Sequence, residues 1–272
     1  MSTNNARHPL FSAQPLVIAA LHLPDPIVAG AQGRAWLEDY VITNARIFAR
    51  AGVPAIKLQD QTRESGSAAV ETVARMAALA RLLREELPEV KVGVIFQAHD
   101  AMAPMAVASA SGACFVRLKV FVAAVMTAEG PKHGLAVAAV AARAALGARD
   151  VAILADVFDR TSMPMTDLPP ERAALWAENL GADALVLTGA DFDDSLSRIA
   201  AARTAGVRLP LILGGGVTTA NVAVALASAN GVVVSTALMR RTADVRDLIR
   251  WDADAVWRFM DAAARGSVPP SA

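Results

Sequence analysis

The chain has 272 residues, which is enough for one eight-unit α/β barrel or for two smaller domains. Its 26 basic residues balance 26 acidic ones, so nothing in the net charge indicates nucleic-acid binding. The single cysteine, Cys114, excludes an internal disulfide and fits a reducing cytoplasm.

A polar segment precedes the first apolar run of the chain. Residues 1–14 are predicted to form an N-terminal arm, either loose or inserted as a partial barrel plug. The apolar run at 15–23 ends at Pro24 and Pro26, before a signal peptide or a membrane span can be completed. We therefore expect a soluble cytoplasmic protein with no membrane span.

Eight short apolar runs alternate with segments of helical character along the rest of the chain. The predicted strands lie at 16–23, 55–60, 92–97, 114–121, 151–157, 184–188, 211–213 and 231–236. Helices are predicted at 36–51, at 73–87, before Gly112, before Leu146, at 170–180, at 196–205, after the glycines at 214–216, at 244–250 and at 254–264. The segment through 127–133 is expected to be a long loop.

The runs are close to continuously apolar, as is typical of parallel strands that are buried on both faces. No low-complexity linker divides the chain. The pattern predicts a single (β/α)8 TIM barrel over 15–272. A doubly wound sheet is the alternative, but the sequence contains no marker of the crossover that reverses strand order.

Catalytic groups of a TIM barrel lie at the carboxyl ends of its strands. Alternation along a strand turns Arg117 and Lys119 toward the barrel interior, and the same parity turns Lys57 and Asp156 inward. Buried charges must pair or shift their pKa values, so we expect these four groups to form one network. The alternative is an ion cluster that only supports the interior.

Two histidines also follow predicted strands. His99, with Gln97, is predicted to face inward, and His99 and Asp100 either exchange protons or cap the next helix. His22 is either an acid or base, or an anchor for its loop. A metal site could be assembled from His22, Asp60, His99 and Asp156, but no HExxH or CxxC motif supports one. We predict no metal and no cofactor.

A short strand runs into Gly214, Gly215 and Gly216 and then into two threonines suited to cap a helix. Glycines let the backbone approach a ligand closely, and free N–H groups at a helix start favour an anion. Phosphate sites of TIM barrels lie after strands seven and eight, where Ser235 and Thr236 also fall. The alternative is a simple tight turn, and the nearby acids would repel a phosphate if they faced it. These acids are Asp191, Asp193 and Asp194.

Several runs, in one order over nearly the whole chain, resemble the BtpA/SgcQ family. They are ALHLP (20–24), VGVIFQAHD (92–100), FVRLKVF (115–121) with TAEG (127–130), ILAD (153–156), ADALVLTG (182–189), and GGGVT (214–218) with NV (221–222). The resemblance implies a TIM barrel of the ribulose-phosphate-binding type, a phosphate-like site after strands seven and eight, and a homo-oligomer. The family is named for a role in photosystem I accumulation, and other members occur among sugar-utilisation genes.

The chain both matches and departs from the family pattern at its strand ends. The matching residues are Asp100, Arg117, Thr127, Asp156, Thr188, Gly189, Gly216 and Thr236. The departures are LQDQT (58–62), QAHD (97–100), Lys119 where the family has Asn, Arg160-Thr161, and Ser235. They indicate a divergent branch with chemistry of its own.

Together these observations predict an enzyme that acts on a phosphorylated sugar or a similar small anionic metabolite. Lys119 would be an electrophile or a Schiff-base amine, with Asp156 and His99 exchanging protons. We expect Lys119, Asp156 and the triple glycine to surround one cavity. The ligand-binding residues would be Thr188, Gly189, Gly214, Gly215, Gly216, Ser235, Thr236, Lys57, Gln97 and Arg160. The alternative is a non-catalytic assembly or regulatory factor that retains a ligand pocket.

Overall fold

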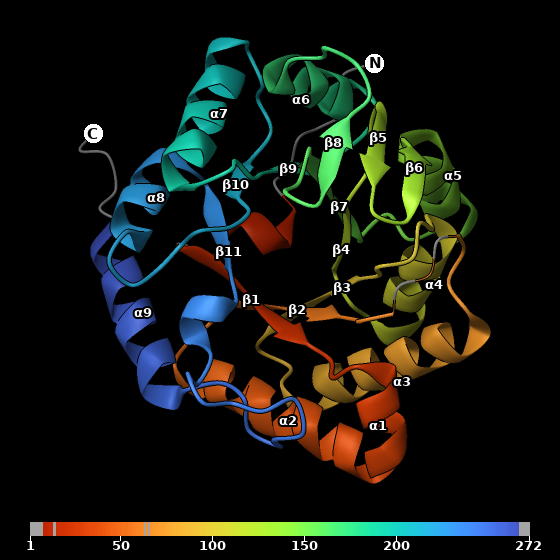
Figure 1. The fold of residues 1–272 in the computed structure, drawn as a ribbon, viewed down its shortest axis with the longest axis vertical. Helices are drawn as coiled ribbons and strands as arrows, with labels where there is room; N and C mark the ends of the chain where they lie inside the picture. The colour runs from red at the N-terminus through yellow and green to blue at the C-terminus, as the bar shows by residue number, and fades with distance from the viewer. Residues whose placement is uncertain (1–7, 13–14, 63, 65, 267–272) are drawn as a thin grey trace.

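The fold is known from a computed structural model, which describes residues 8–12, 15–62, 64 and 66–266. Eight parallel strands close into a barrel in the order β1-β11-β10-β9-β7-β4-β3-β2, and helices surround the ring (Figure 1). The strands are β1 (Leu16–His22), β2 (Ala55–Gln59), β3 (Lys91–Ile95), β4 (Phe115–Leu118), β7 (Ala152–Val157), β9 (Ala184–Leu187), β10 (Leu211–Leu213) and β11 (Gly231–Val234). The predicted TIM barrel is confirmed.

The helices bury one face against the strands. They are α1 (Pro26–Gln32), α2 (Arg34–Arg50), α3 (Val70–Glu86), α4 (Met102–Ser111), α5 (Ala136–Ala145), α6 (Pro170–Asn179), α7 (Phe192–Thr204), α8 (Val222–Ser228) and α9 (Ala253–Gly266). The sequence analysis did not predict α1, although Asp25 accepts a hydrogen bond from the Ile27 amide and Pro26 opens the helix, as is common at helix starts.

A second sheet stands outside the barrel, where the sequence analysis expected only loops. Strands β5 (Ala124–Thr127) and β6 (Gly130–His133) form a hairpin after β4, and β8 (Ser162–Pro164), which follows β7, pairs with β5. β6 and β8 each pair with the central strand β5 in the antiparallel direction. This small sheet joins two loops at the carboxyl end of the barrel, so it forms a wall beside the barrel mouth (Figure 1).

The predicted helix at 244–250 is wrong. The segment is a set of turns, closed by a hydrogen bond from the Arg240 amide to the Arg250 carbonyl. The Asp244 side chain accepts from the Arg246 amide, and the Asp247 side chain accepts from the Asp244 amide. Short acidic side chains that bond nearby amides in this way compete with helix formation.

The barrel interior is filled by small and branched side chains around one large ring. Its buried residues are Leu16, Ile18, Ala20, Ala55, Phe115, Ala152, Leu154, Ala184, Val186, Ile212 and Val233. Gly93 makes room for the Phe115 ring, because a Cβ atom at that position would overlap it. The interior is therefore a packed core, and ligand space begins only above it.

Residues 8–12 close the amino end of this core. Leu10 and Phe11, from the short 3-10 helix η1 (Pro9–Ser12), are buried in the interior cluster. His8 reaches the carbonyl of Asp150, which lies just before β7. The division into an arm at 1–14 and a barrel at 15–272 stays a prediction, since residues 1–7, 13–14 and 267–272 lie outside the described residues.

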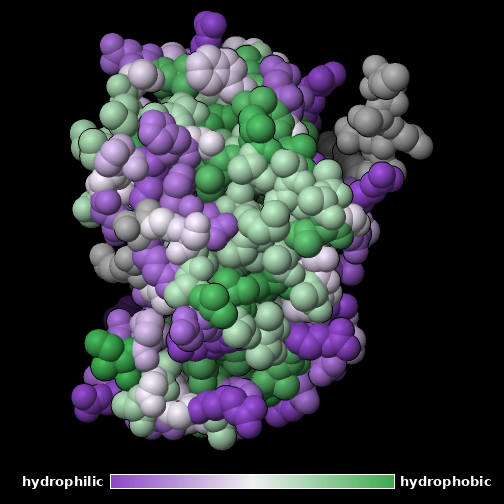
Figure 2. Space-filling view, turned by 90° about the vertical axis from the view of Figure 1, so that its right-hand side faces the viewer, coloured by the Kyte–Doolittle hydropathy of each residue, from purple (hydrophilic) through white to green (hydrophobic). Residues whose placement is uncertain are grey.

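Hydrophobic residues gather in a patch on the face that carries α4 and α5, with hydrophilic residues around it (Figure 2). On α5 and just beyond it, Val137 is 76% exposed and Leu146 is 39% exposed, and several alanines lie between them. Within the described ranges, no helix combines the length and the apolar character needed to cross a bilayer.

Candidate functional site

Seven strands each point one residue into the barrel beyond the packed core, at different heights because the strands are staggered. Each lies two positions beyond an interior residue of its strand, so the side-chain parity predicted from the sequence holds. The residues are His22, Lys57, Arg117, Asp156, Thr188, Gly214 and Ser235.

Arg117 of β4 and Asp156 of the neighbouring strand β7 form a buried ion pair among these residues. The Arg117 Nε atom donates to both carboxylate oxygens of Asp156, at 3.0 and 3.2 Å, and a terminal nitrogen lies 2.9 Å from Oδ1. Arg117 is 8% exposed and Asp156 is 2% exposed. Burial raises the pKa of Asp156 to about 6, against the opposing influence of Arg117. Such a pair is rigid and directional.

The other members of the predicted charge network make contacts elsewhere. Lys57 Nζ donates to Gln59 Oε1 at 2.7 Å. Lys119 Nζ donates to Gln97 Oε1 at 3.1 Å and lies 3.7 Å from a carboxylate oxygen of Asp159. The four predicted groups thus share an electrostatic environment, but only Arg117 and Asp156 are in direct contact.

The expected single cavity is divided into two that share Arg117. The glycine-turn cavity, of about 530 Å³, contains Lys57 and Gly214 to Gly216. Its other lining residues are Ala20, His22, Gln59, Arg117, Arg160, Val217, Thr218, Val233, Val234, Ser235, Thr236 and Ala237. The Lys119 cavity, of about 440 Å³, has the β5-β6-β8 sheet as one wall. Asp156 lies beneath both and lines neither.

The glycine-turn cavity is cationic. Lys57, Arg117 and Arg160 line it, and no carboxylate of the described residues does. Among the described residues, the backbone amides of Gly215 and Gly216 have no hydrogen-bond acceptor. Oriented backbone amides and guanidinium groups of this kind bind oxyanions.

Arg160 is fixed over the glycine turn. Its Nε atom donates to the Gly189 carbonyl at 2.6 Å, and a Cβ atom added at Gly215 or Gly216 would lie 3.6 or 3.2 Å from its terminal nitrogens. Gly216 has φ of +77°, a conformation that favours glycine. The guanidinium therefore faces the backbone amides that line the same cavity.

Thr188 packs against Gly214 and leaves no room for a side chain at that position. A side chain at Gly214 would overlap the Thr188 hydroxyl. That hydroxyl is buried, and no described residue hydrogen-bonds it. Thr188, which the sequence predicts to bind the ligand, does not itself line the glycine-turn cavity.

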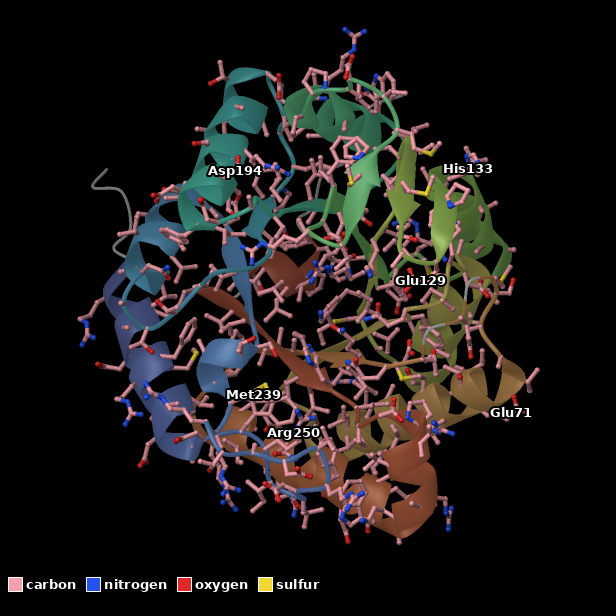
Figure 3. All side chains as sticks on the ribbon, viewed as in Figure 1. Glu71, Glu129, His133, Asp194, Met239 and Arg250 are labelled. Atoms are coloured by element: carbon pink, nitrogen blue, oxygen red, sulfur yellow. The ribbon has the colours of Figure 1, made fainter. Side chains whose placement is uncertain are left out.

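The structure corrects one expectation about the glycine turn. The threonines do not cap the following helix: α8 begins at Val222, and Asn221 accepts from the Thr218 amide at 2.7 Å. The nearby acids would repel a phosphate only if they faced the turn, and none of them lines the cavity. Asp191 caps α7, and Asp194, labelled in Figure 3, pairs with Arg198 at 3.1 Å.

The Lys119 cavity carries charges of both signs. Lys119, Lys132 and Arg117 line it together with Glu64, Asp100, Glu129 and Asp159. Glu129 lies on the β5–β6 turn (Figure 3). The sequence analysis missed Asp159 as the partner of Lys119, although its place directly after an apolar strand was a usable signal.

His99 and Asp100 lie in this cavity with different roles. Asp100 accepts hydrogen bonds from the amides of Met102, Ala103 and Ala68, so it caps α4 and ties two loops together. Burial lowers the pKa of His99. The contacts of Asp100 therefore support the capping interpretation over the acid–base pair.

His22 is a neutral group at the edge of the glycine-turn cavity. Burial, with a further contribution from Lys57, lowers its pKa to about 3. Its Nε2 atom lies 3.5 Å from the Ser235 hydroxyl. A neutral imidazole of this kind orients a hydrogen bond and does not take up a second proton at neutral pH. No group of three or more His, Cys, Asp or Glu within the described ranges is placed to hold a metal ion.

Replacing His22 by glutamine should weaken the pH dependence of stability. The pKa of His22 is about 3 in the folded chain and 6.5 in the unfolded chain. Between pH 3 and pH 6.5, the unfolded chain therefore binds a proton at His22 and the folded chain does not. Stability is lost as pH falls from 6.5 toward 3, by about 1.4 kcal/mol per pH unit. Urea unfolding at pH 7, 6 and 5 should show a shallower loss for His22→Gln than for the wild type. His133→Gln, at an exposed histidine, is the control; three parallel curves would contradict the assignment.

Comparison with known proteins places the chain among relatives. The family model described as the BtpA family matches residues 14–265. The Photosystem I biogenesis protein BtpA of Synechocystis sp. is 30% identical over 178 residues, which is 64% of this chain and 61% of that protein. An uncharacterized protein of Archaeoglobus fulgidus is 28% identical over 209 residues, covering 74% of this chain and 82% of that protein.

Solved structures show the same fold at low identity. A native KDPGal structure has a TM-score of 0.60 and 13% identity, covering 93% of this chain and 97% of the other. Ligand-free tryptophan synthase from M. tuberculosis has a TM-score of 0.62 and 12% identity, covering 96% and 98%. These likenesses support the barrel alone. With a family match over nearly its whole length, the chain belongs to the BtpA family.

Proposed function

We propose that the chain is an enzyme acting on a phosphorylated sugar or a similar small anionic metabolite. The observation that carries this proposal is the charge of the glycine-turn cavity, where the guanidinium groups of Arg117 and Arg160 meet the glycine turn without a lining carboxylate from the described residues. A neutral sugar gains nothing from such a field, whereas a phosphate offers several acceptor oxygens to it.

The remaining part of the substrate would extend toward the Lys119 cavity, because Arg117 borders both spaces. Its mixed charges suit hydroxyl and carbonyl groups, and Lys119 would act there as an electrophile with His99 close by. The reaction classes that we propose are isomerisation, aldol-type cleavage and glycosyl-bond chemistry. We also propose that the protein is cytoplasmic.

The alternative is a non-catalytic assembly or regulatory factor that keeps a ligand pocket. The name of the Synechocystis relative, a photosystem I biogenesis protein, favours it. The aligned region covers only 61% of that protein. A panel of phosphorylated sugars separates the two: binding with turnover supports the enzyme, and binding without turnover supports the factor.

Arg160→Ala should weaken the binding of inorganic phosphate at least tenfold, about 1.4 kcal/mol, because it removes the guanidinium held over the glycine turn. Titration calorimetry at fixed ionic strength measures this. Arg172→Ala removes an exposed arginine of α6 and should leave the affinity unchanged, which controls for net charge. Equal affinities for the wild type and Arg160→Ala would remove the anion site from this cavity.

We also propose that the apolar face of α4 and α5 joins copies of the chain. Val137→Asp should lower the mass measured by light scattering at micromolar concentration, since it places a charge in the contact. Val224→Asp, at a valine of α8 that is 52% exposed, is the matched control. A monomeric wild type, or equal masses for all three proteins, would end this proposal.

A further inference from the structure

Lysine is scarce in this chain, and its placement is selective. Only four of the 26 basic residues are lysines: Lys57, Lys91, Lys119 and Lys132. Three of them line the two cavities at the barrel mouth, and Lys91 begins β3 at the opposite end of the barrel. Arginine serves elsewhere as the surface cation, so the lysines at the mouth are candidates for work that a guanidinium cannot do.

Lys57 differs from Lys119 in its surroundings. Lys57 is 3% exposed, and its Nζ atom donates to the amide oxygen of Gln59. Among the described residues, it forms no ion pair with a carboxylate. Lys119 is more open, with a side chain that is 29% exposed, and it is paired with Asp159. The surroundings of Lys119 therefore suit an ammonium ion, and those of Lys57 suit a neutral amine.

The electrostatic surroundings of Lys57 also favour the neutral amine. Burial, and then the neighbouring Arg117 guanidinium, lower the pKa of Lys57 well below 10.5. Asp156 opposes this effect, but it is already bound to Arg117. A lysine near other cations in a dry site is a stronger nucleophile at neutral pH, because more of it carries a free electron pair.

We propose that Lys57 is the nucleophilic amine of the site and forms a Schiff base with a phosphorylated aldehyde or ketone held by the glycine turn. Lys57 and the three glycines line the same cavity, so one small molecule placed there would lie beside both. This inference rests on the proposed function. It moves the Schiff-base role that the sequence analysis gave to Lys119 onto a different strand.

The step balances without a cofactor. The nitrogen electron pair of Lys57 attacks the carbonyl carbon, and a C–N bond forms. The carbonyl oxygen leaves as water with one proton of the amine and one proton from solvent, so the imine keeps its other N–H and is positively charged. The protonated imine then accepts the electron pair of an adjacent C–H bond, whose proton passes to solvent, or of an adjacent C–C bond, whose other fragment leaves as a carbonyl compound after its hydroxyl loses a proton. The resulting enamine takes up a proton at carbon. Hydrolysis returns the carbonyl oxygen to the product and the free amine to Lys57.

Borohydride trapping tests the assignment. The protein is mixed with glyceraldehyde 3-phosphate or dihydroxyacetone phosphate, reduced, digested and mapped by mass spectrometry. With four lysines in the chain, each adduct is assigned without ambiguity. We expect the adduct on Lys57 in the wild type, and more than a tenfold loss of total adduct in Lys57→Met. Methionine approximates the volume of the buried side chain, and a thermal melt verifies that the variant folds.

The controls separate the possible failures. Lys91→Met alters a lysine far from both cavities and should keep the adduct, and Arg160→Ala should reduce it by weakening phosphate capture. An adduct on Lys119 alone, or equal labelling of all four lysines, would overturn the inference. Phosphate binding that depends on Arg160, with no adduct at Lys57, would overturn this inference alone, whereas loss of that dependence would overturn the proposed function.

Discussion

The buried ion pair between Arg117 and Asp156 is the interaction on which the barrel mouth depends. It lies directly above Phe115 and Leu154, the interior residues two positions earlier on the same strands. Removing either partner leaves an unpaired buried charge, at a cost of about 3–5 kcal/mol. Because Arg117 borders both cavities, the pair also fixes the shape of the site and the charge that surrounds Lys57.

The fold and the set of inward-facing residues follow from two simple regularities of the sequence. Eight apolar runs separated by helical segments predicted the barrel, and alternation along each strand predicted that Lys57, Arg117 and Asp156 face inward. Both hold in a closed barrel because backbone pairing and a packed interior leave each strand only one register. Local sequence was sufficient for these features.

Other features depended on contacts that local sequence does not encode. The β5-β6-β8 sheet forms because two loops distant in sequence meet, and it supplies one wall of the Lys119 cavity. The surroundings of Lys57 depend on Arg117, a residue of another strand. The turns at 244–250 carry helix-compatible residues, but aspartate side chains capture their amides.

The family relationship and the site geometry bear on different questions. The family match spans the barrel and the glycine turn, and Lys119, Arg160 and Ser235, where we expect this chain to depart from the family pattern, line the two cavities. A scaffold common to several activities commonly changes at such loop positions. The guanidinium-lined cavity and the buried amine of Lys57 therefore give the most specific basis for the reaction that we propose for this chain.

The central claim is that an oxyanion is held against the glycine turn, and a pair of variants at Gly215 tests it most directly. A Cβ atom there meets only ordinary contacts, at 3.5 and 3.6 Å, so both Gly215→Ala and Gly215→Asp should fold. Calorimetric titration with inorganic phosphate should give near wild-type affinity for the alanine variant and no measurable binding for the aspartate variant, whose charge opposes the anion. Equal affinities for the two variants would contradict the claim.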